Sequence, residues 1–304
     1  MATLQITPPE SPDQVSVIVV TYNSASCIRA CLESVLAQQG VTVEIAVVDN
    51  ASQDDTVGVV RDFGTRVNLM ANQDNAGFGR GCNQGFAASS GQFIYFLNPD
   101  ARLVQPDALA ALVHAIRSHP HWGMAATRVV SATGKDESPP SPIYPGQTHA
   151  KNDFARLPGR IAWVIGASMF IRRDVLAALN GFDPDFFLYS EETDLCLRLR
   201  KLGHEIGFLN EVTVRHIGAV SERGCDPYAM WTRKMEGLHL FWRKHFSPGD
   251  TAHLVRRDLR RARFRLLLNG ILAALQPPHS TAWQKQRRYL AVRNTSLRFL
   301  SSSE

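Results

Sequence analysis

The sequence predicts an α/β protein with a mostly parallel central sheet and helices on both of its faces. Short apolar, β-branched runs alternate with segments of helical periodicity over the first hundred residues, the pattern of parallel strands joined by crossover helices. Polar residues follow three of the apolar runs, where such sheets bind their ligands. The 304 residues are 44% hydrophobic and 20% charged, a composition typical of globular chains.

Local patterns indicate where the first elements lie. Apolar runs rich in β-branched or aromatic residues predict strands at 15–21, 43–48, 67–70 and 93–97. Apolar residues along one helical face predict helices at 28–36, 57–63 and 78–88. Asp54 and Asp55 precede the second helix, where acids favour a helix N-terminus. Gly40 follows the first, as expected beyond a helix C-terminus.

The second half of the chain changes character. Strands are expected at 163–171 and 212–216, and a loop at the Pro-, Ser- and Gly-rich residues 134–158. The segment 191–201, EETDLCLRLRK, predicts a helix because acids fill its first turn and bases its last. After about Pro248 the pattern becomes an arginine-rich amphipathic helix. We therefore expect a main domain at 1–248 and a basic helical extension at 249–304.

Composition excludes several classes of protein. The N-terminus has no basic segment followed by an apolar one, so no secretory signal is expected. No apolar run approaches the roughly 18 residues that span a bilayer. Five cysteines without metal-ligand spacing indicate reduced thiols. These observations predict a cytoplasmic protein.

Positive charge gathers in the helical extension. Residues 251–304 contain ten Arg and one Lys but only two acids, so their net charge is +9. Because the whole chain carries +5, the remaining residues carry −4. The arginines alternate with apolar residues: Leu254, Leu259, Phe264 and Leu267. This pattern is typical of a helix on an anionic membrane, so we expect peripheral contact with the inner face of the cytoplasmic membrane. A solvated face packed on the main domain and an oligomer contact are the alternatives. No nucleic-acid partner is expected, because no reading motif accompanies the charge.

Polar clusters at three strand ends predict a binding site. Thr21-Tyr22-Asn23, Asp49-Asn50 and Asn98-Pro99-Asp100 each follow a predicted strand, and parallel strands bring their carboxyl ends to one edge. The glycine-rich segment 75–85, NAGFGRGCNQG, does not fit the dinucleotide-binding pattern, and no phosphate-binding GxxxxGK[ST] loop is present. The site is therefore unlike those of dehydrogenases and P-loop nucleoside triphosphatases.

Six segments in order resemble a known family: TYNSASCIRACLESVLAQ, VVDNASQDDT, NAGFGRGCNQG, FLNPDARL, WVIGASMFIRRDV and GFDPDFFLYSEETDLCLRLRKLG. Together they are similar to an inverting glycosyltransferase of family 2 with the GT-A fold, and most similar to its bacterial rhamnosyltransferase-like group. The resemblance covers roughly residues 15–245. It implies a GT-A catalytic domain at 1–248.

The resemblance implies a divalent metal, Mg²⁺ or Mn²⁺, at the end of the fourth strand. The family places an Asp-x-Asp motif there, and this chain has Asn98-Pro99-Asp100, so the first acid is missing. Asp100 is then the principal metal ligand, and Asn98 is expected to contact the ribose or the metal indirectly. His216 resembles the histidine that completes the site in some relatives. A purely structural histidine is the alternative.

The resemblance also implies the residues that bind the nucleotide of the donor. Asp49 accepts a hydrogen bond from N3–H of uracil or thymine. The remaining implied contacts are Thr21, Tyr22 and Asn23 around the base, and Asn75, Arg80 and Asn83 at the phosphates or ribose. Arg80 beside three glycines suits a phosphate cradle, and a surface charge is the alternative.

Transfer with inversion needs one carboxylate as general base near the acceptor hydroxyl. By resemblance Glu192 takes this position, beside Glu191, and Asp194 is the reserve candidate. The alternative is that these acids only complement the helix dipole. Trp163, Gly166 and Ala167 are expected to bind the acceptor sugar, although Trp163 is also suited to core packing.

The implied reaction moves a sugar, L-rhamnose in the group it resembles most, from a dTDP- or UDP-linked donor to a glycan or lipid-linked glycan in bacterial surface polysaccharide synthesis. Hexosyl or galactofuranosyl transfer from a UDP donor is one alternative, and a non-catalytic nucleotide-sugar or glycan-binding module is another. A nucleotidyltransferase would need a basic, glycine-rich loop after the first strand, and TYNSAS is not such a loop.

Overall fold

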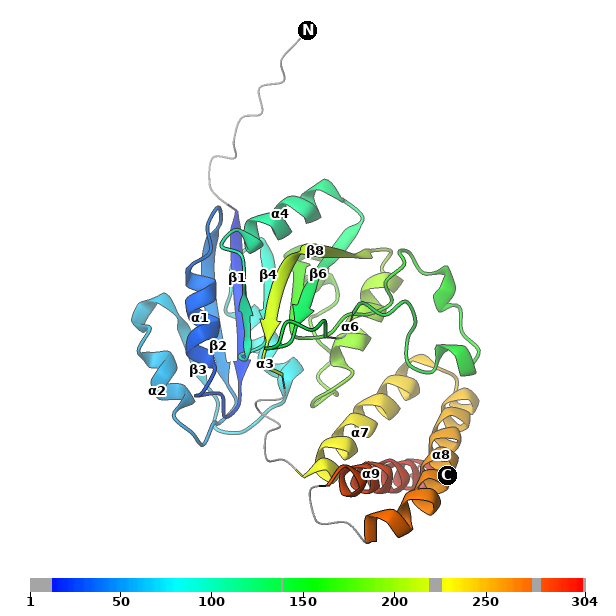
Figure 1. The fold of residues 1–304 in the computed structure, drawn as a ribbon. Helices are drawn as coiled ribbons and strands as arrows, with labels where there is room; N and C mark the ends of the chain where they lie inside the picture. Colours follow the sequence, from blue (N-terminus) through cyan, green and yellow to red (C-terminus); the bar gives the residue numbers. More distant parts are fainter. Residues whose placement is uncertain (1–12, 138, 219–225, 275–279, 303–304) are drawn as a thin grey trace.

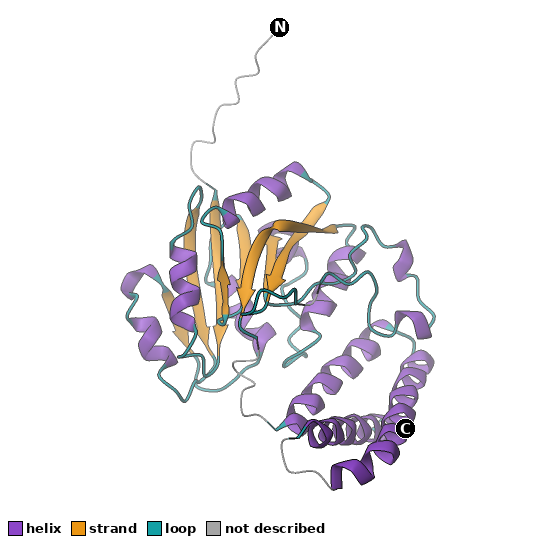
Figure 2. Ribbon diagram, viewed as in Figure 1, coloured by secondary structure: helices purple, strands orange, loops and turns teal. Residues whose placement is uncertain are grey.

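The computed structural model describes residues 13–137, 139–218, 226–274 and 280–302. Its central sheet has eight strands among these residues, in the order β3-β2-β1-β4-β7-β6-β8-β5 (Figure 2). In chain order the strands are β1 Gln14–Thr21, β2 Thr42–Asp49, β3 Asn68–Ala71, β4 Phe93–Leu97, β5 Ala101–Leu103, β6 Trp122–Val130, β7 Ser168–Arg172 and β8 Glu205–His216. The α/β architecture with a mixed, mostly parallel sheet is confirmed.

Helices cover both faces of the sheet and continue beyond it at the C-terminal end (Figure 1). The α-helices are α1 Ile28–Leu36, α2 Thr56–Arg61, α3 Phe78–Ala87, α4 Ala108–Ser118, α5 Arg173–Ala178, α6 Glu191–Lys201, α7 Pro227–His245, α8 Pro248–Ala274 and α9 Thr281–Ser301. Short 3₁₀ turns lie at Gly64–Arg66, Gln147–His149 and Phe154–Arg156. The last two lie within residues 134–158, which sequence predicted as loop throughout.

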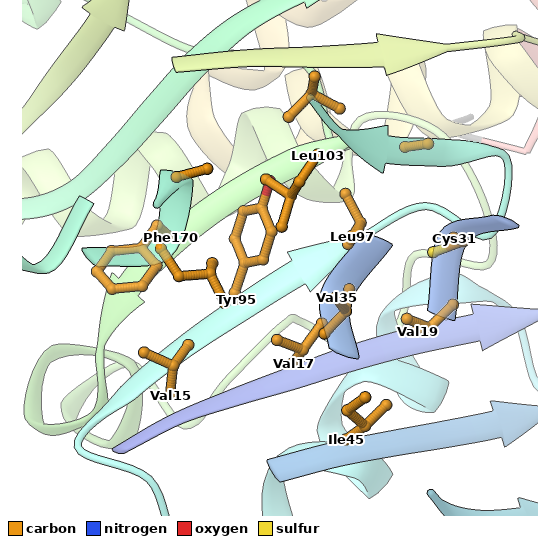
Figure 3. Close-up of a cluster of buried hydrophobic side chains, with 14 of the residues drawn as sticks. Val15, Val17, Val19, Cys31, Val35, Ile45, Tyr95, Leu97, Leu103 and Phe170 are labelled. Carbon is orange, nitrogen blue, oxygen red and sulfur yellow. The ribbon is translucent and has the colours of Figure 1, made fainter. Parts of the chain in front are cut away.

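Alternate residues of the buried strands build the two halves of the core. Val15, Val17 and Val19 of β1 pack with Tyr95 of β4 under α1 and α4, in the cluster drawn in Figure 3. Ile18 of β1 and its neighbours face the opposite way and meet α3, α5 and α6. Strands buried on both faces explain the continuous apolar runs in the sequence.

Strand direction decides which residues reach the site edge. β1, β2 and β4 are parallel, so Thr21 pairs with Asp49 at one edge, the edge at which β4 also ends. β7 runs antiparallel to β4, with Ser168 opposite Leu97, so the residues before β7 return to that edge. β8 ends there too, where His216 pairs with Ala101 of β5. Sequence predicted a strand at 163–171, but regular pairing begins only at Ser168.

The C-terminal helices form a separate layer beside α6 (Figure 1). Met235 of α7, Ala262 of α8 and Val292 of α9 share one apolar cluster. A second cluster joins Leu254 of α8 to Tyr144 of the long loop and to α6 and α7. α7 lies before the expected boundary at residue 248 yet packs with α8 and α9, and the division into two domains stays a prediction. Among the described residues, no helix is both long and apolar enough to cross a bilayer.

Candidate active site

Asp49 is the centre of a buried polar cluster at the ends of β1 and β2. Its Oδ1 accepts hydrogen bonds from Thr21 Oγ1 at 2.7 Å and Ser52 Oγ at 2.5 Å, and Oδ2 accepts one from the Ser52 amide at 2.9 Å. Asp49 is only 1% exposed and Thr21 is fully buried. Thr21 therefore positions Asp49, and its expected place around the base stays a prediction. The contact of Asp49 with a nucleobase stays a prediction.

Residues 22–23 form the outer wall of this cluster. Asn23 has a left-handed backbone with φ of 53°, its amide donates to Ser52 Oγ at 2.8 Å, and its Oδ1 accepts from the Gln53 amide at 2.7 Å. Tyr22 beside it is 39% exposed. An exposed aromatic ring next to a buried carboxylate suits the predicted base pocket.

Asp100 and His216 meet at the ends of β4 and β8. Nε2 of His216 lies 3.1 Å from Asp100 Oδ1 and 3.4 Å from Asn98 Nδ2, and Nδ1 lies 2.9 Å from Glu137 Oε2. Burial lowers the pKa of His216, but the hydrogen bonds and charges of Asp100 and Glu137 outweigh burial and raise that pKa above its ordinary value. Sequence reasoning brought the first three residues together and missed Glu137.

Asp100 and His216 offer donor atoms that suit a divalent cation. A carboxylate oxygen and an imidazole nitrogen lie 3.1 Å apart at the site edge, and both are common ligands of such cations. Among the described residues, no group of three or more His, Cys, Asp or Glu side chains is arranged to hold a metal alone. A cation here would therefore need further ligands from phosphate oxygens and water, which is how Mg²⁺ is commonly held.

Glu191 and Glu192 begin α6 in an environment that disfavours negative charge. Burial raises the pKa of Glu192 to about 7. Burial and then the charge of Glu192 raise the pKa of Glu191 well above its ordinary value. Glu191 is 4% exposed, and its Oε2 has no hydrogen-bond partner among the residues that the structure describes. The half-buried Glu192 is therefore the better candidate for exchanging a proton with a ligand.

A strained turn aims these acids. Tyr189 and Ser190, directly before α6, both have left-handed backbones, with φ of 72° and 70°. Such conformations cost about 1–3 kcal/mol each and persist where surrounding structure imposes them. Here Gly237 of α7 packs so closely on the Tyr189 carbonyl oxygen that a Cβ at position 237 would collide with it.

Asp194 has a structural role. Its Oδ2 lies 2.7 Å from Arg198 Nε and its Oδ1 2.7 Å from His245 Nε2, and it is 1% exposed. Arg198 in turn donates to the carbonyl oxygens of Leu179 and Gly181. Both oxygens of Asp194 are engaged by Arg198 and His245, so Glu192 is the more accessible acid and Asp194 stays the reserve candidate.

The glycines of segment 75–85 serve packing. A Cβ at Gly81 would lie 2.8 Å from Val20 Cγ1, and one at Gly85 would lie 2.5 Å from Ile18 Cγ2. Gly77, with φ of 90°, abuts the Phe187 carbonyl oxygen. These residues recur every fourth position, so α3 can approach β1 closely. The expected phosphate cradle at Arg80 and these glycines stays a prediction.

Polar side chains of the same segment form hydrogen bonds with backbone atoms nearby. Asn83 bonds to the Phe182 backbone through both ends of its side-chain amide, at 2.7 and 2.8 Å, and its expected contact with the nucleotide stays a prediction. Arg80 Nε donates to the Pro184 carbonyl at 2.9 Å. Asn75 Oδ1 accepts from the Gly77 amide at 3.0 Å. Nucleotide contact by Arg80 and Asn75 stays a prediction.

Residues 163–167 lie between Glu192 at the start of α6 and the predicted metal ligands Asp100 and His216. The Asn98 amide donates to the Ala167 carbonyl at 3.1 Å, and a Cβ at Gly166 would lie 3.6 Å from Glu192 Cβ. Trp163 is half-buried and donates its Nε1–H to the Ile143 carbonyl at 3.1 Å. Gly166 and Ala167 thus lie between the predicted base and the predicted metal ligands, where an acceptor would be expected.

Comparison with known proteins defines the class. The sequence profile of glycosyl transferase family 2 matches residues 16–179, more than half of the chain, and the chain belongs to that family. It is 25% identical over 300 residues to the N-acetylglucosaminyl-diphospho-decaprenol L-rhamnosyltransferase of Mycobacterium tuberculosis, an alignment that covers 84% of this chain and 97% of that one.

Two further similarities bear on length and fold. The chain is 43% identical over 103 residues to the succinoglycan biosynthesis protein ExoO of Rhizobium meliloti, 34% of this chain but only 29% of that relative. Its fold resembles that of the mannosyltransferase PcManGT of Pyrobaculum calidifontis, solved with GDP-Man and Mn²⁺, with a TM-score of 0.58, 20% identity and coverage of 96% and 91%. The GT-A fold is confirmed.

Proposed function

We propose that this chain is an inverting, metal-dependent glycosyltransferase that moves L-rhamnose from a nucleoside-diphosphate donor to a glycan or lipid-linked glycan of the bacterial cell surface. One observation carries the proposal. Glu192, with its raised pKa, lies against Gly166, and Ala167 bonds to Asn98 beside the Asp100–His216 pair. A base and a diphosphate-binding site on either side of one short segment suit a direct displacement.

The proposed chemistry assigns one task to each side. Glu192 takes the proton of the acceptor hydroxyl, and that oxygen forms a bond to the anomeric carbon of the donor. The bond from that carbon to the diphosphate breaks on the opposite face, which inverts the configuration. Asp100 and His216 would hold a divalent cation, which would neutralise charge on the leaving diphosphate. The Mn²⁺ in the solved relative supports this choice of metal.

Support for rhamnose comes from the relative whose full length aligns with this chain, an L-rhamnosyltransferase acting on a lipid-linked N-acetylglucosamine. The test is a donor screen that reads both the melting temperature and the release of nucleoside diphosphate with Mn²⁺. We expect dTDP-L-rhamnose to raise the melting temperature more than UDP-hexoses do, because a ligand at 100 times its Kd stabilises by about 2.7 kcal/mol. A shift with UDP-hexoses alone would replace rhamnose by a hexose.

A binding module without catalysis is the second candidate, favoured by the missing first acid at Asn98. The same screen separates the two functions, because a module would be stabilised by the donor without releasing nucleoside diphosphate. Asp100→Ala is the matched variant. It should lose turnover stimulated by Mn²⁺ while its melting temperature stays near that of the wild type.

The residues of α8 that suit a membrane contact differ in part from those that the sequence indicated. Leu254 and Leu259 are buried against the rest of the protein, which corrects their place in the expected interfacial helix. Phe264, Leu267 and Leu268 are instead 60%, 78% and 54% exposed. Exposed arginines flank them: Arg260, Arg261, Arg263 and Arg265. We propose that this apolar-basic patch at 260–268 docks on an anionic bilayer. Its arginines would contact the negative headgroups, and its apolar side chains would insert below them.

A further inference from the structure

Glu137 lies on the opposite side of the His216 imidazole from Asp100. Its Oε2 is 2.9 Å from Nδ1, whereas Nε2 is 3.1 Å from Asp100 Oδ1. The side chains of His216 and Asp100 are each 9% exposed, so the ring has little room to turn. One buried imidazole therefore joins two carboxylates through its two nitrogens.

The backbone places Glu137 for this contact. Its amide donates to the Val129 carbonyl at 2.8 Å, and Asp136 beside it pairs with Val130, so the segment continues the edge of β6. Gly218, two residues beyond His216, faces the same carboxylate, and a Cβ there would lie 3.6 Å from Glu137 Oε1. Glu137 thus reaches His216 from a strand-like segment with a defined position.

The contact selects one form of the imidazole. A carboxylate accepts hydrogen bonds and donates none, so Nδ1 carries the hydrogen that Glu137 accepts. When a cation held by Asp100 takes the lone pair of Nε2, the contact with Glu137 is the one that still holds the ring. Histidines that bind metals commonly donate their other ring N–H to a carboxylate, which orients the ring and strengthens it as a ligand. Glu137 itself cannot share a cation with Asp100 here, because the ring separates them.

We infer that Glu137 is a positioning residue that holds His216 with Nε2 directed at the cation bound by Asp100. The inference rests on the metal role given to Asp100 and His216 in the proposed function. It assigns a task to a residue in the long loop for which no resemblance predicted one. Glu137 acts through the imidazole, without touching the donor.

The test measures metal binding apart from turnover. Mn²⁺ binding to the full chain is followed by electron paramagnetic resonance, with Mn²⁺ alone and with dTDP added. We expect Glu137→Ala to weaken Mn²⁺ about 10–100-fold, the usual effect of removing such a partner, and Glu137→Gln to weaken it less because its amide oxygen still accepts from Nδ1. Glu211→Gln, an exposed acid on the same strand as His216, is the matched control and should bind Mn²⁺ like the wild type.

A second readout separates positioning from loss of structure. In ¹⁵N-labelled protein with Mg²⁺, the His216 resonances, assigned by comparison with His216→Ala, should show hydrogen on Nδ1 in the wild type and lose that preference in Glu137→Ala. Wild-type Mn²⁺ affinity in both Glu137 variants, with loss in His216→Ala, would overturn the inference alone. Wild-type affinity in His216→Ala as well would overturn the metal assignment of the proposed function together with the inference.

Discussion

Glu192 owes its proposed reactivity to burial, and the same burial predicts how the rate depends on pH. A carboxyl whose pKa lies about 7 is half ionised near neutral pH, where an ordinary glutamate is fully ionised. Only the ionised form can accept a proton from the acceptor hydroxyl. The acid side of the pH profile should therefore report this residue directly.

We expect kcat/KM to rise with pH up to about 7 and then to level, because deprotonation of Glu192 activates the base. Glu192→Gln should lower kcat by roughly 10²–10⁴-fold and abolish that rise, while donor binding remains. Steady-state kinetics between pH 5 and 9 provide the measurement. If Glu191→Gln loses the rise and Glu192→Gln keeps it, the base has been assigned to the wrong acid.

Substitution of Asp194 is expected to lower the stability of the protein, whereas substitution of Glu192 is expected to lower the rate. Asp194→Asn removes a buried charge that pairs with Arg198 and bonds to His245, and breaking such a buried ion pair costs about 3 kcal/mol or more. The control is Asp174→Asn, whose pair with Arg172 is largely exposed and should contribute under about 1 kcal/mol. Urea unfolding of both variants checks the difference. Equal stability of the two would contradict the structural role.

At the scale of elements, α3 shows how packing overrides helix propensity. Alanine is normally favoured over glycine inside a helix by about 1 kcal/mol. At Gly85 the added Cβ would lie 2.5 Å from Ile18 Cγ2, so strand and helix would have to separate. Overpacking of this kind typically costs about 1–3 kcal/mol, which exceeds the gain in propensity.

Gly85→Ala should therefore destabilise the protein by about 1–2 kcal/mol, measured by urea unfolding. Gly249→Ala in α8 is the control, since its added Cβ would meet nothing closer than Ser247 Oγ at 4.0 Å and should be neutral or stabilising. If Gly85→Ala keeps full stability but binds the donor more weakly, the result would contradict the packing role and favour the predicted phosphate cradle.

Sequence predicted best those elements whose signals are local. The strand Phe93–Leu97 and the helices Ile28–Leu36 and Glu191–Lys201 match because their apolar runs, spacing and terminal charges lie within the element. The antiparallel β7 and the strand β6 were missed or misplaced, since their pairing partners are remote in sequence.

The site divides in the same way. Asp49 and Asp100 could be placed at one edge because each follows a strand whose direction the α/β pattern predicts, whereas His216 was placed by resemblance to the family. Glu137 could not, because it lies in a loop and meets His216 only through the fold. The bonds of Asn83 to Phe182 could not be predicted either, because the two residues are remote in sequence and meet only through the fold.

At the scale of the whole molecule, α8 both completes the core and projects from it. Its first turns pack Leu254 and Val255 against Tyr144 and Phe154, whereas residues 264–268 are exposed. Deleting residues 251–304 would therefore uncover apolar surface and confound a binding test. Point substitutions in the patch at 260–268 avoid that problem.

We expect Phe264→Ser combined with Leu267→Ser to reduce flotation with vesicles that contain anionic lipid, because apolar insertion is lost while the arginines remain. The melting temperature should change little, since both side chains are exposed. Leu202→Ser, an exposed leucine at the end of α6, is the control and should float like the wild type. Raising salt should release the wild type, as expected for charges within a Debye length of the headgroups. Flotation that is equal in all variants would exclude the patch.

The contact of Gly237 with the Tyr189 carbonyl oxygen makes α7 a brace for the turn that precedes Glu192, the predicted base. The two left-handed residues that aim Glu192 would relax if nothing pressed on them, and the helix that presses on them belongs to the C-terminal layer. A larger residue at 237 would push the brace outward and release the turn. The backbone directly before the predicted base is thus held in place by a helix outside the sheet, which links the C-terminal layer to the candidate active site.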